Sequence, residues 1–423
     1  EGARKADGSG ERHRLRKTCP VKMRVLCLFC GTKSIDRAFE RLSWETVSVD
    51  WEARYAPDHV ADIMSWDYTQ YPKGYFDFVW GSPACTHFSI ARTRGGPRDL
   101  AGACALVART LEIMRYFGCP WALENPATGL LRHQSLMSGL PWDDITYCAY
   151  GYGYKKKTRI WHTLGEAWKP RAPCCKATPC ATFAAEGMHH LSAQRGPTRT
   201  RIGLRAWDNC TLAQLYSMPP ELCDEIAAAA HKMAWDRKCD ELLRILETRK
   251  WRKQTHRTNI SSEYVHTQHV SKEGKAYCVR KVLHPQQSEY VGRGPIMDHV
   301  RSMLPVWMPQ LEHFAVTLNR QVQCAPHKDK NNVGTTAILF LGEFEGGDLV
   351  LADGNRFSGR REWFGYDGAQ IEHWNTPITS GIKYAVVAHN TRNKPEAFPY
   401  KKKKHAASEA QSTHEGAPEQ EAD

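Results

Sequence analysis

The chain of 423 residues carries a formal net charge of +12 at pH 7 and has a pI of about 9.0. Hydrophobic residues make up 41% of it, so a globular protein with sizeable cores is expected, and a length above that of one usual core predicts two domains. No apolar run approaches the roughly 20 residues that span a membrane, which argues against a membrane partner. The positive surplus favours a polyanionic partner, nucleic acid first, although a soluble protein that merely happens to be basic has the same composition.

The first 20 residues are polar and charged, and they are predicted to form a disordered basic arm. They contain neither the apolar core of a signal peptide nor an initiator Met, so we expect a processed chain or an excised piece of one. Fifteen cysteines without a signal peptide indicate a reducing, intracellular compartment, where thiols serve as nucleophiles, ligands or core residues.

Residues 21–235 alternate short apolar runs with helix patterns. This alternation predicts an α/β fold, a doubly wound, Rossmann-like domain. One segment, 162–206, breaks the rhythm because it is rich in Cys, Pro and Ala, and it is interpreted as a small insert. The expected strands are 21–29, 46–50, 76–81 and 121–124, and the expected helices are 35–42, 100–117 and 220–233, with regular structure also at 212–215.

A charged stretch, 236–275, is interpreted as a linker that begins as an amphipathic helix. The apolar side of that helix would come from Leu242, Leu243, Leu246 and Trp251. The linker therefore separates two bodies of different character.

Residues 276–393 consist of short β-like runs separated by turns such as 345–348. The pattern predicts an all-β-rich sandwich or roll with a helix near 295–304. The tail, 394–423, is predicted to be disordered, and its four lysines at 401–404 would suit nuclear import in a eukaryote. The expected strands are 314–318, 335–341, 348–351 and 383–388.

The strand that turns at Gly31 into a helix is a common type of nucleotide pocket. Roughly twenty residues later the second strand ends in Asp50 and Trp51, where an acid can bind ribose hydroxyls and an indole can stack on adenine. Each residue alone is more often a loop acid or a core aromatic, but their order and spacing together indicate a nucleotide cofactor. The positions predicted to line its pocket are Phe29, Gly31, Thr32, Asp50, Trp51, Asp62, Ile63 and Pro83.

Cys85 lies just past a predicted strand end, where a reactive group can be presented, and Glu124 ends another strand. A thiolate beside a carboxylic acid suits attack on C6 of a pyrimidine, because the acid can hydrogen-bond N3 and stabilise the charge that develops in the ring. The ring then becomes nucleophilic at C5 and can accept a methyl group.

Residues 22–233 resemble the C5-cytosine methyltransferases, especially the compact forms found in phages and mobile elements. The family's G-x-P-P-C-Q-x-F-S loop is similar to 81–89, its Glu-Asn-Val to 124–126, and its Arg-x-Arg after a Tyr-Gly turn to 157–159. A late segment, 205–220, resembles the family's closing motifs, which complete the pocket for S-adenosylmethionine.

The resemblance implies that S-adenosylmethionine donates a methyl group to cytosine, with Cys85 as the nucleophile, Glu124 at ring N3 and Arg159 at the cytosine O2. The departures leave open a weakened or selective methyltransferase, or a degenerate enzyme that only binds nucleic acid. RNA also stays open as the substrate, because compact relatives of the family include tRNA methyltransferases. The positions that depart from the family pattern are Ala84, Thr86, Lys157 and Lys33, the last where the first loop usually has a second glycine.

The insert contains soft metal ligands, and a loop-rich segment without a core of its own needs a staple such as zinc. Their spacing does not match a standard zinc finger, so free thiols packed in a small domain are the alternative. The basic run 155–157 just before the insert would suit phosphate contacts, or is simply a solvated face. The candidate zinc ligands are Cys174, Cys175, Cys180 and His189.

His327 and Asp329 place two ligands on one face of a strand, because side chains alternate along it. With His373 downstream they complete a two-histidine, one-carboxylate set, which leaves positions open on Fe(II) for substrate and oxygen. Lys383 follows His373 by ten positions and offers a cation for the distal carboxylate of 2-oxoglutarate.

Residues 276–392 therefore resemble the Fe(II)/2-oxoglutarate dioxygenases with a double-stranded β-helix, or jelly-roll, core. By position, the resemblance implies that Asn319 assists in binding 2-oxoglutarate, whereas His389 is interpreted as structural. The motif is specific for this superfamily and poor at naming a substrate.

A methyl donor site fused to a methyl oxidase site suggests that the product of the first is the substrate of the second. The hypothesis is a monomer that flips a cytosine out of double-stranded DNA, methylates it at C5, and oxidises 5-methylcytosine to 5-hydroxymethylcytosine with TET-like chemistry. In the alternative, the dioxygenase acts on another substrate, such as a protein side chain or an alkylated base.

Overall fold

The computed structural model describes residues 23–90, 92, 96–187, 189, 191–192, 208–209, 212–251, 268–270, 276–278, 287–291, 294–305, 307–309, 311 and 314–392. Four predicted segments lie wholly or largely outside these residues. They are the basic arm, the tail with its lysine run, the last part of the insert after residue 192, and the later part of the linker. Among the helices that the structure describes, none is long and apolar enough to cross a membrane.

A seven-stranded sheet forms the centre of the first half, with the strand order β3-β2-β1-β4-β5-β7-β6. The strands from β3 to β5 in that order are parallel, whereas β7 and β6 are antiparallel additions at one edge. The mixed α/β character expected from the sequence is confirmed. The strands are β1 (Arg24–Leu28), β2 (Glu45–Asp50), β3 (His59–Val60), β4 (Phe78–Gly81), β5 (Trp121–Pro126), β6 (Trp142–Thr146) and β7 (Lys157–His162).

Helices cover both faces of this sheet, because side chains alternate along each strand. Val25 and Cys27 of β1 belong to a buried cluster with residues of α1 and α5, whereas Leu26 and Leu28 belong to a second cluster with residues of α2. The apolar run that predicts a buried strand thus serves two cores at once. The helices are α1 (Ser34–Arg41), α2 (Leu100–Phe117), α3 (Ala181–Glu186), α4 (Leu212–Tyr216), α5 (Pro220–Thr248) and α7 (Pro295–Arg301). The short 3-10 helices are η1 (Ala53–Tyr55), η2 (Tyr68–Gln70), η3 (Leu130–His133), η4 (Ser135–Met137), η5 (Tyr147–Tyr150) and η6 (Gly165–Ala167).

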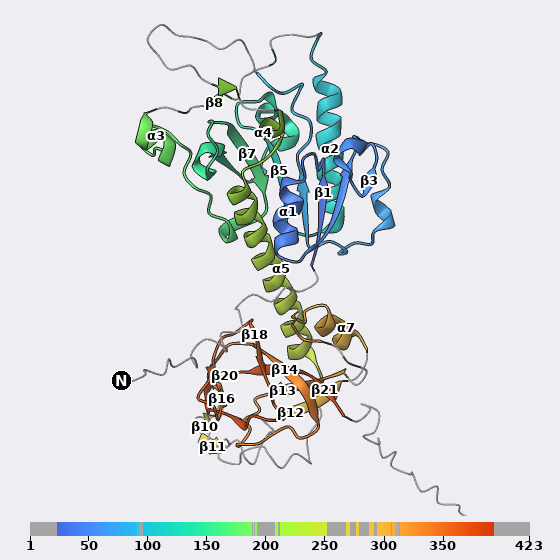
Figure 1. Ribbon diagram of the computed structural model, residues 1–423. Helices are drawn as coiled ribbons and strands as arrows, with labels where there is room; N and C mark the ends of the chain where they lie inside the picture. Colours follow the sequence, from blue (N-terminus) through green and yellow to red (C-terminus); the bar gives the residue numbers. More distant parts are fainter. Residues whose placement is uncertain are drawn as a thin grey trace, which may run out of the picture.

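Helix α5 joins the two halves of the protein (Figure 1). Its first turns bury Leu222 and Ile226 in the first half, and its last turns bury Leu242 and Leu246 in the core of the second half. The sequence predicts a boundary before residue 236 and then a separate linker helix. The structure instead continues one helix of 29 residues across that point, because its apolar positions face one core and then the other. The start of the predicted linker is therefore a core element of the second half.

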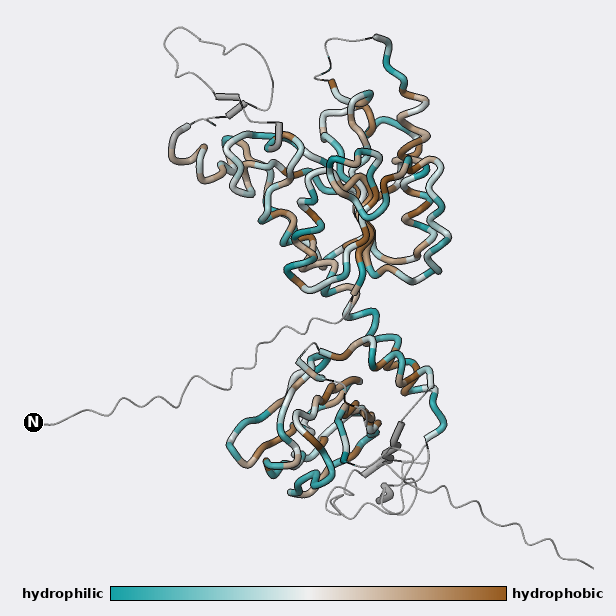
Figure 2. Tube along the Cα trace, turned by 45° about the vertical axis from the view of Figure 1, so that its right-hand side comes forward, coloured by the Kyte–Doolittle hydropathy of each residue, from teal (hydrophilic) through white to brown (hydrophobic). Residues whose placement is uncertain are grey.

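A five-stranded antiparallel sheet, β12-β13-β21-β14-β18, dominates the second half. On one face, Leu339 of β14 packs against residues of α7 and α5. On the other, Phe340 packs against Leu349 and Ile378 from two smaller sheets, so the core is a sandwich. Figure 2 shows hydrophobic residues, in brown, along the central strands of both halves. The expected β-rich character is confirmed. The remaining strands are β8 (Leu191–Ser192), β9 (Asp208–Asn209), β10 (Gln268–Val270), β11 (Ala276–Cys278), β12 (Gln287–Val291), β13 (Phe314–Arg320), β14 (Asn332–Leu341), β15 (Phe344–Gly346), β16 (Leu349–Leu351), β17 (Arg356–Phe357), β18 (Trp363–Tyr366), β19 (His373–Asn375), β20 (Ile378–Gly381) and β21 (Tyr384–Thr391).

Candidate functional site

The loop after β1 contains three residues with a left-handed backbone, Phe29 (φ 60°), Gly31 (φ 47°) and Lys33 (φ 56°). The N–H of Gly31 donates to Oδ2 of Asp50 at 3.0 Å, and the N–H of Glu52 donates to Oδ1 of the same carboxylate at 2.9 Å. The sequence predicts Asp50 as a ligand of ribose hydroxyls, and the structure uses its carboxylate to hold two loops together. At Lys33, the backbone has the conformation that a glycine adopts freely and that costs other residues roughly 1–2 kcal/mol.

Other residues predicted to line the cofactor pocket surround this loop. Trp51, directly after β2, is 74% exposed, so the face of its indole is open to a planar ligand. The hydroxyl of Thr32 donates to the carbonyl of Tyr216 at 3.3 Å, which joins the loop to α4. The carboxylate of Asp62 accepts a nearby backbone N–H at 2.9 Å, whereas Ile63 is buried in the core. The predicted positions therefore lie where β1, β2 and β3 end, except Pro83, which follows β4.

Cys85 lies on the loop after β4. Its carbonyl accepts the N–H groups of Phe88 and Ser89 at 2.9 and 2.8 Å, so the loop turns back on itself directly after the thiol. Nδ2 of Asn125, on the neighbouring strand β5, donates to the carbonyl of Pro83 at 3.0 Å. The loop is thereby fixed to the strand that carries the predicted catalytic carboxylate.

Glu124 and Lys156 share the surroundings of the Cys85 thiol. Burial raises the pKa of Cys85, the negative charge of Glu124 raises it further, and Lys156 acts in the opposite direction. Nζ of Lys156 lies 3.5 Å from Oε1 of Glu124 and donates to the Tyr147 hydroxyl at 3.2 Å. This buried Glu124 oxygen has no hydrogen-bond partner among the described residues, so it suits a ligand that brings a donor. Sequence reasoning missed Lys156 because it interpreted the basic run 155–157 either as a phosphate contact or as a solvated face.

Arg159 is engaged elsewhere. Its guanidinium pairs with both carboxylate oxygens of Asp144, at 2.7 and 2.9 Å, and lies 3.4 Å from the centroid of the Trp142 ring. Arg159 stands opposite Asn125 in the β5–β7 register, so the alternation along β5 turns it to the face opposite that of Glu124. The predicted contact with the cytosine O2 would require the guanidinium to leave Asp144.

The second candidate site unites His327, Asp329 and His373. Nε2 of His327 lies 3.6 Å from Oδ1 of Asp329, and Nε2 of His373 lies 3.6 Å from Oδ2 of the same carboxylate. The imidazole centroids are 4.3 Å apart, and one ligand atom from each of the three residues lies within 4.8 Å of the others. Ligand atoms that converge in this way can share one metal ion.

Backbone hydrogen bonds hold the two histidines in place. His327 and His373 exchange N–H···O=C bonds of 3.1 and 3.0 Å, which form an isolated antiparallel bridge. Nδ1 of His327 lies 2.7 Å from the carbonyl oxygen of Ala325, and Nδ1 of His373 lies 3.0 Å from that of Ile371. Because a carbonyl only accepts, each Nδ1 carries the proton, and each Nε2 lone pair is directed to the metal position.

Lys383 places a cation in the interior between the sheets. The residue is 2% exposed, its Nζ lies 3.8 Å from the Phe340 ring centroid, and it donates to the carbonyl of Gly347. Burial lowers the pKa of Lys383 to about 7, while the carboxylate of Asp348 acts in the opposite direction. Asn319 is also buried. It pairs with Ala385, two residues after Lys383, so its side chain lies on the same face of the sheet as that of Lys383. A buried charge costs several kcal/mol unless an anion joins it, so this position suits a carboxylate ligand.

Two further polar residues support this site. Nδ2 of Asn332 donates to Oδ2 of Asp329 at 3.4 Å and to the hydroxyl of Thr336 at 3.1 Å. Nε2 of His389 and the hydroxyl of Thr317 lie 3.1 Å apart, which gives His389 a partner in the neighbouring strand. Sequence reasoning missed Asn332, whose position three residues after Asp329 is the only local signal.

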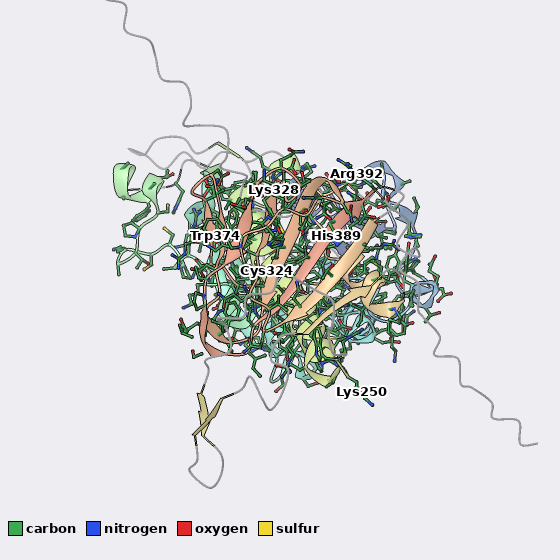
Figure 3. The ribbon with its side chains drawn as sticks, turned by 90° about the horizontal axis from the view of Figure 1, so that it is seen from below. Lys250, Cys324, Lys328, Trp374, His389 and Arg392 are labelled. Carbon is green, nitrogen blue, oxygen red and sulfur yellow. The ribbon has the colours of Figure 1, made fainter. Side chains whose placement is uncertain are left out.

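Exposed cations flank the second site. Lys328 and Lys330 are exposed on either side of Asp329, and the exposed Arg392 is tied to the same loop by its N–H bond of 2.9 Å to the carbonyl of Asn331. Figure 3 shows Lys328 and Arg392 toward the same side of the β-rich half. We call Lys328, Lys330 and Arg392 the basic rim.

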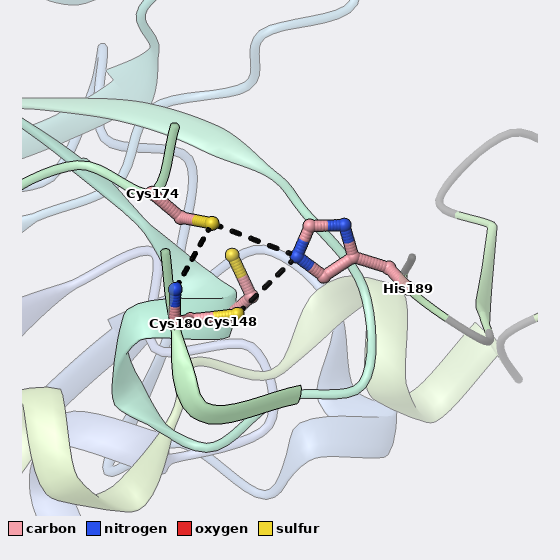
Figure 4. Close-up of side chains that lie close together, drawn as sticks. All are labelled: Cys148, Cys174, Cys180 and His189. Carbon is pink, nitrogen blue, oxygen red and sulfur yellow. Dashed lines mark hydrogen bonds between the residues drawn. The ribbon is translucent and has the colours of Figure 1, made fainter. Parts of the chain in front are cut away.

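A third group of ligand-type side chains lies at the insert (Figure 4). Cys175 does not belong to it, because this residue is exposed and its thiol lies 3.1 Å from the Thr178 hydroxyl. Cys148 of η5 takes the place that the sequence gives to Cys175, a correction that reflects how the chain folds back on itself. The members of this thiol–imidazole cluster are Cys148, Cys174, Cys180 and His189.

Parts of this chain are similar to solved structures. No family model and no curated protein matches the chain. Among solved structures, NgTET1 in complex with 5mC DNA is 22% identical with a TM-score of 0.18, over 18% of this chain and 34% of that one. An oxidoreductase of the 2OG-Fe(II) oxygenase family from Burkholderia pseudomallei is 18% identical with a TM-score of 0.17, over 19% and 43% of the two chains. A Pseudomonas putida prolyl-4-hydroxylase is 13% identical with a TM-score of 0.25, over 38% and 86%.

The matched part of this chain spans about a third of the length of the first of these structures and less than half of the second. None of the three descriptions names a methyltransferase. With TM-scores of at most 0.25, the likenesses are too partial to carry an argument. The chemistry of each site therefore has to follow from its own side chains.

Proposed function

We propose that the second half of the protein is an Fe(II)- and 2-oxoglutarate-dependent dioxygenase with a jelly-roll core. The convergence of His327, Asp329 and His373, whose ligand atoms lie within 4.8 Å of one another, carries this proposal. Two imidazoles and one carboxylate on one side of an ion leave its other positions for a co-substrate and oxygen. Both Nε2 atoms are directed by carbonyl anchors at Nδ1, so the residues present fit Fe(II).

Lys383 and Asn319 would bind 2-oxoglutarate. The described partner of the Lys383 ammonium is a carbonyl oxygen, so the distal carboxylate of the co-substrate would supply the missing negative charge. The Phe340 ring beside it would keep water away from the pair, which strengthens the attraction. When bound, Fe(II) and 2-oxoglutarate would supply, with O₂, the oxidant that hydroxylates a methyl group.

The basic rim favours nucleic acid as the substrate of this half. Three exposed cations beside the iron ligands would contact phosphates on either side of a base. A base must leave the stack before its methyl group reaches a buried metal, at a cost of a few kcal/mol that phosphate contacts would offset. The net charge of +12 acts in the same direction.

The first half supports a second activity, methyl transfer to C5 of cytosine. Cys85 and Glu124 lie where the adjacent parallel strands β4 and β5 end, and Lys156 joins them. In open α/β sheets, ligands bind at the carboxyl ends of the strands. The loop at Gly31 and the exposed indole of Trp51 end the neighbouring strands and would hold S-adenosylmethionine, which supplies the methyl group.

The side chains of this site would divide the work on a flipped cytosine. The Cys85 thiolate forms a bond to C6, and the buried oxygen of Glu124, which has the Lys156 ammonium nearby but no hydrogen-bond partner among the described residues, accepts a hydrogen bond from the edge of the base. Electrons move through the ring so that C5 takes the methyl group, and the donor would leave as the neutral thioether. Loss of the C5 proton to a water molecule acting as base then breaks the C6–S bond, and the electron pair returns to sulfur as the Cys85 thiolate. Lys156 favours the thiolate by its charge.

We infer that the two activities act in sequence on double-stranded DNA, so that 5-methylcytosine made by the first half becomes 5-hydroxymethylcytosine in the second. The test incubates the full-length protein with unmodified duplex DNA, S-adenosylmethionine, Fe(II) and 2-oxoglutarate, and measures nucleosides by mass spectrometry. Wild type should form 5-hydroxymethylcytosine, and His327→Ala should stop at 5-methylcytosine. Methylcytosine that wild type never oxidises would contradict the sequence of steps and favour another dioxygenase substrate, such as a protein side chain.

A parallel incubation replaces the duplex with structured RNA. Modified cytosine in RNA alone would overturn the DNA substrate while retaining both chemistries. No modified cytosine in either polymer would favour a module that only binds nucleic acid.

A further inference from the structure

The thiol–imidazole cluster is buried and compact. Cys148, Cys174, Cys180 and His189 are each at most 8% exposed, and one ligand atom from each lies within 4.8 Å of the others. Nε2 of His189 lies 3.8 Å from Sγ of Cys174 and 3.4 Å from Sγ of Cys180. Figure 4 shows the imidazole and the three thiols pointing toward one another.

These separations match a tetrahedral zinc site. With Zn–S bonds of about 2.3 Å and a Zn–N bond of about 2.0–2.1 Å, a tetrahedron places sulfur and nitrogen ligands roughly 3.5 Å apart. The two S···N distances of the cluster lie on either side of that value. Four protein ligands also fill the coordination sphere, and a closed sphere is the mark of a structural site rather than a catalytic one.

Backbone N–H groups point to two of the three sulfur atoms. The N–H of Cys180 points to Sγ of Cys174 at 3.3 Å, and the N–H of Phe183 points to Sγ of Cys180 at 3.4 Å. The N–H of Cys174 is itself held by the Thr146 hydroxyl at 2.8 Å. Backbone donors aimed at sulfur stabilise negative charge, and several thiolates in one buried place repel one another unless a cation joins them.

Beyond Leu164 and Trp168, which pack into the first core, the described residues of the insert have little hydrophobic support. The buried hydrophobic cluster at this place consists of Cys148, Cys174 and Cys180, with Phe183 partly buried against it. A core of this size stabilises a segment too weakly, and small loop-rich units commonly add a structural metal. The ligands come from two places, η5 within the β6–β7 connection and the insert that follows β7.

We propose that Cys148, Cys174, Cys180 and His189 bind one structural Zn²⁺ ion that fastens the insert to the β6–β7 connection. Binding replaces the protons of three thiols by Zn²⁺ and releases them to solvent. The neighbour of Cys148 in η5 is Tyr147, whose hydroxyl accepts from Lys156, the partner of Glu124. The metal would therefore hold the insert at the edge of the site that contains Cys85. That the insert contacts DNA there rests on the proposed methyl transfer.

Metal analysis of the full-length protein tests the ligand set. Substitution distinguishes the set that contains Cys148 from the set that contains Cys175. Wild type purified from zinc-supplemented medium is expected to hold one zinc that a thiol-modifying mercurial releases. Cys148→Ser should lose that zinc, whereas Cys175→Ser, an equal change at an exposed thiol of the same segment, should keep it. Retention in Cys148→Ser with loss in Cys175→Ser would overturn the set, as would wild type without mercurial-releasable metal.

Cobalt substitution keeps the test independent of the iron centre and of folding defects in the variants. Co²⁺ bound by cysteine thiolates gives intense sulfur-to-metal charge-transfer absorption, which the iron site cannot produce because it contains no cysteine. The wild-type protein is sufficient for this readout: it should show the band, and absence of the band would overturn the proposal. Neither readout requires DNA or methyl transfer, so the zinc site and the proposed enzyme activity can fail separately.

Discussion

The two proposed catalytic centres differ in how completely the protein alone assembles them. In the second half, a backbone bridge joins His327 to His373, and a carbonyl fixes each ring. In the first half, one oxygen of Glu124 has no hydrogen-bond partner among the described residues, and Arg159 is held by Asp144. A metal centre needs a few converging atoms, and a β bridge can fix them. A site for a cofactor and a base is completed only when the cofactor and the base bind.

The largest expected effect separates the two centres. Cys85→Ala removes the only atom proposed to bond to C6, so methyl transfer to unmodified DNA should fall by roughly 10⁴-fold or more. Oxidation of DNA that already contains 5-methylcytosine should persist, because the iron centre is intact. Nucleoside mass spectrometry on both substrates measures this, and loss of both activities would show that the halves do not work independently.

The buried cation of the second half gives the next largest effect. Lys383→Met should abolish stimulation by 2-oxoglutarate and also make the apoprotein more stable at pH 6, by about 1–4 kcal/mol, because it removes a buried charge. The folded-state pKa of about 7 lies below the usual 10.5, so the cost of the charge is full below pH 7 and disappears as pH rises toward 10.5. Thermal unfolding between pH 6 and 10 should therefore show a gain that shrinks with pH.

Lys383→Arg is the matched control for this prediction. Arginine stays charged across that range, so the gain in stability at pH 6 should not appear, and the variant should lose stability relative to wild type as pH rises and Lys383 becomes neutral. A Lys383→Met protein that is less stable at pH 6 would contradict the view that the ammonium is an uncompensated charge.

A smaller effect tests the charges around the thiol of the first half. Lys156 lowers the pKa of Cys85, against burial and Glu124, so Lys156→Met should raise that pKa and shift the acidic limb of kcat/KM for methyl transfer to higher pH. Because less thiolate is then present at pH 7, the rate at that pH should fall, by roughly tenfold if the pKa rises by about 1. The exposed neighbour Lys155 offers a control, since Lys155→Met should leave the profile in place. An equal loss at every pH would favour a purely structural role.

The smallest effect concerns the cofactor loop. Lys33 has a left-handed backbone, so Lys33→Gly should raise the free energy of unfolding of the first half by about 0.5–1 kcal/mol. Arg37→Gly, at an exposed interior position of α1, should lower it by about 1 kcal/mol because no such strain is relieved there. Urea unfolding followed by tryptophan fluorescence compares the two, and a loss of stability in both would contradict the strain.

Local sequence signals predicted several elements well because their causes are local. The helix expected at 100–117 has those bounds, since the carboxylate of Asp99 accepts the N–H of Gly102 at its start and Gly118 ends it with a φ of 64°. The apolar run 335–341 likewise predicted a strand, and the structure shows that this strand, β14, packs on both faces. Strands β6 and β7 escaped prediction because charged residues interrupt their apolar positions.

Local sequence patterns indicated the chemistry that we propose for each half. Spacing of two along a strand indicated His327 and Asp329 as a pair, and the position of Cys85 past a strand end indicated a nucleophile. The two ligands do meet, but they lie between β13 and β14, where His327 forms an isolated bridge with His373 and Asp329 belongs to no strand, so the period of a strand is not what places them.

Which distant residues meet follows from the tertiary fold and not from local patterns. It brought Cys148 rather than Cys175 to the insert, turned Arg159 to Asp144, placed Lys156 beside Glu124, and continued α5 through both cores. The physical reason is that contacts between elements depend on packing and register, which no spacing within a single element specifies.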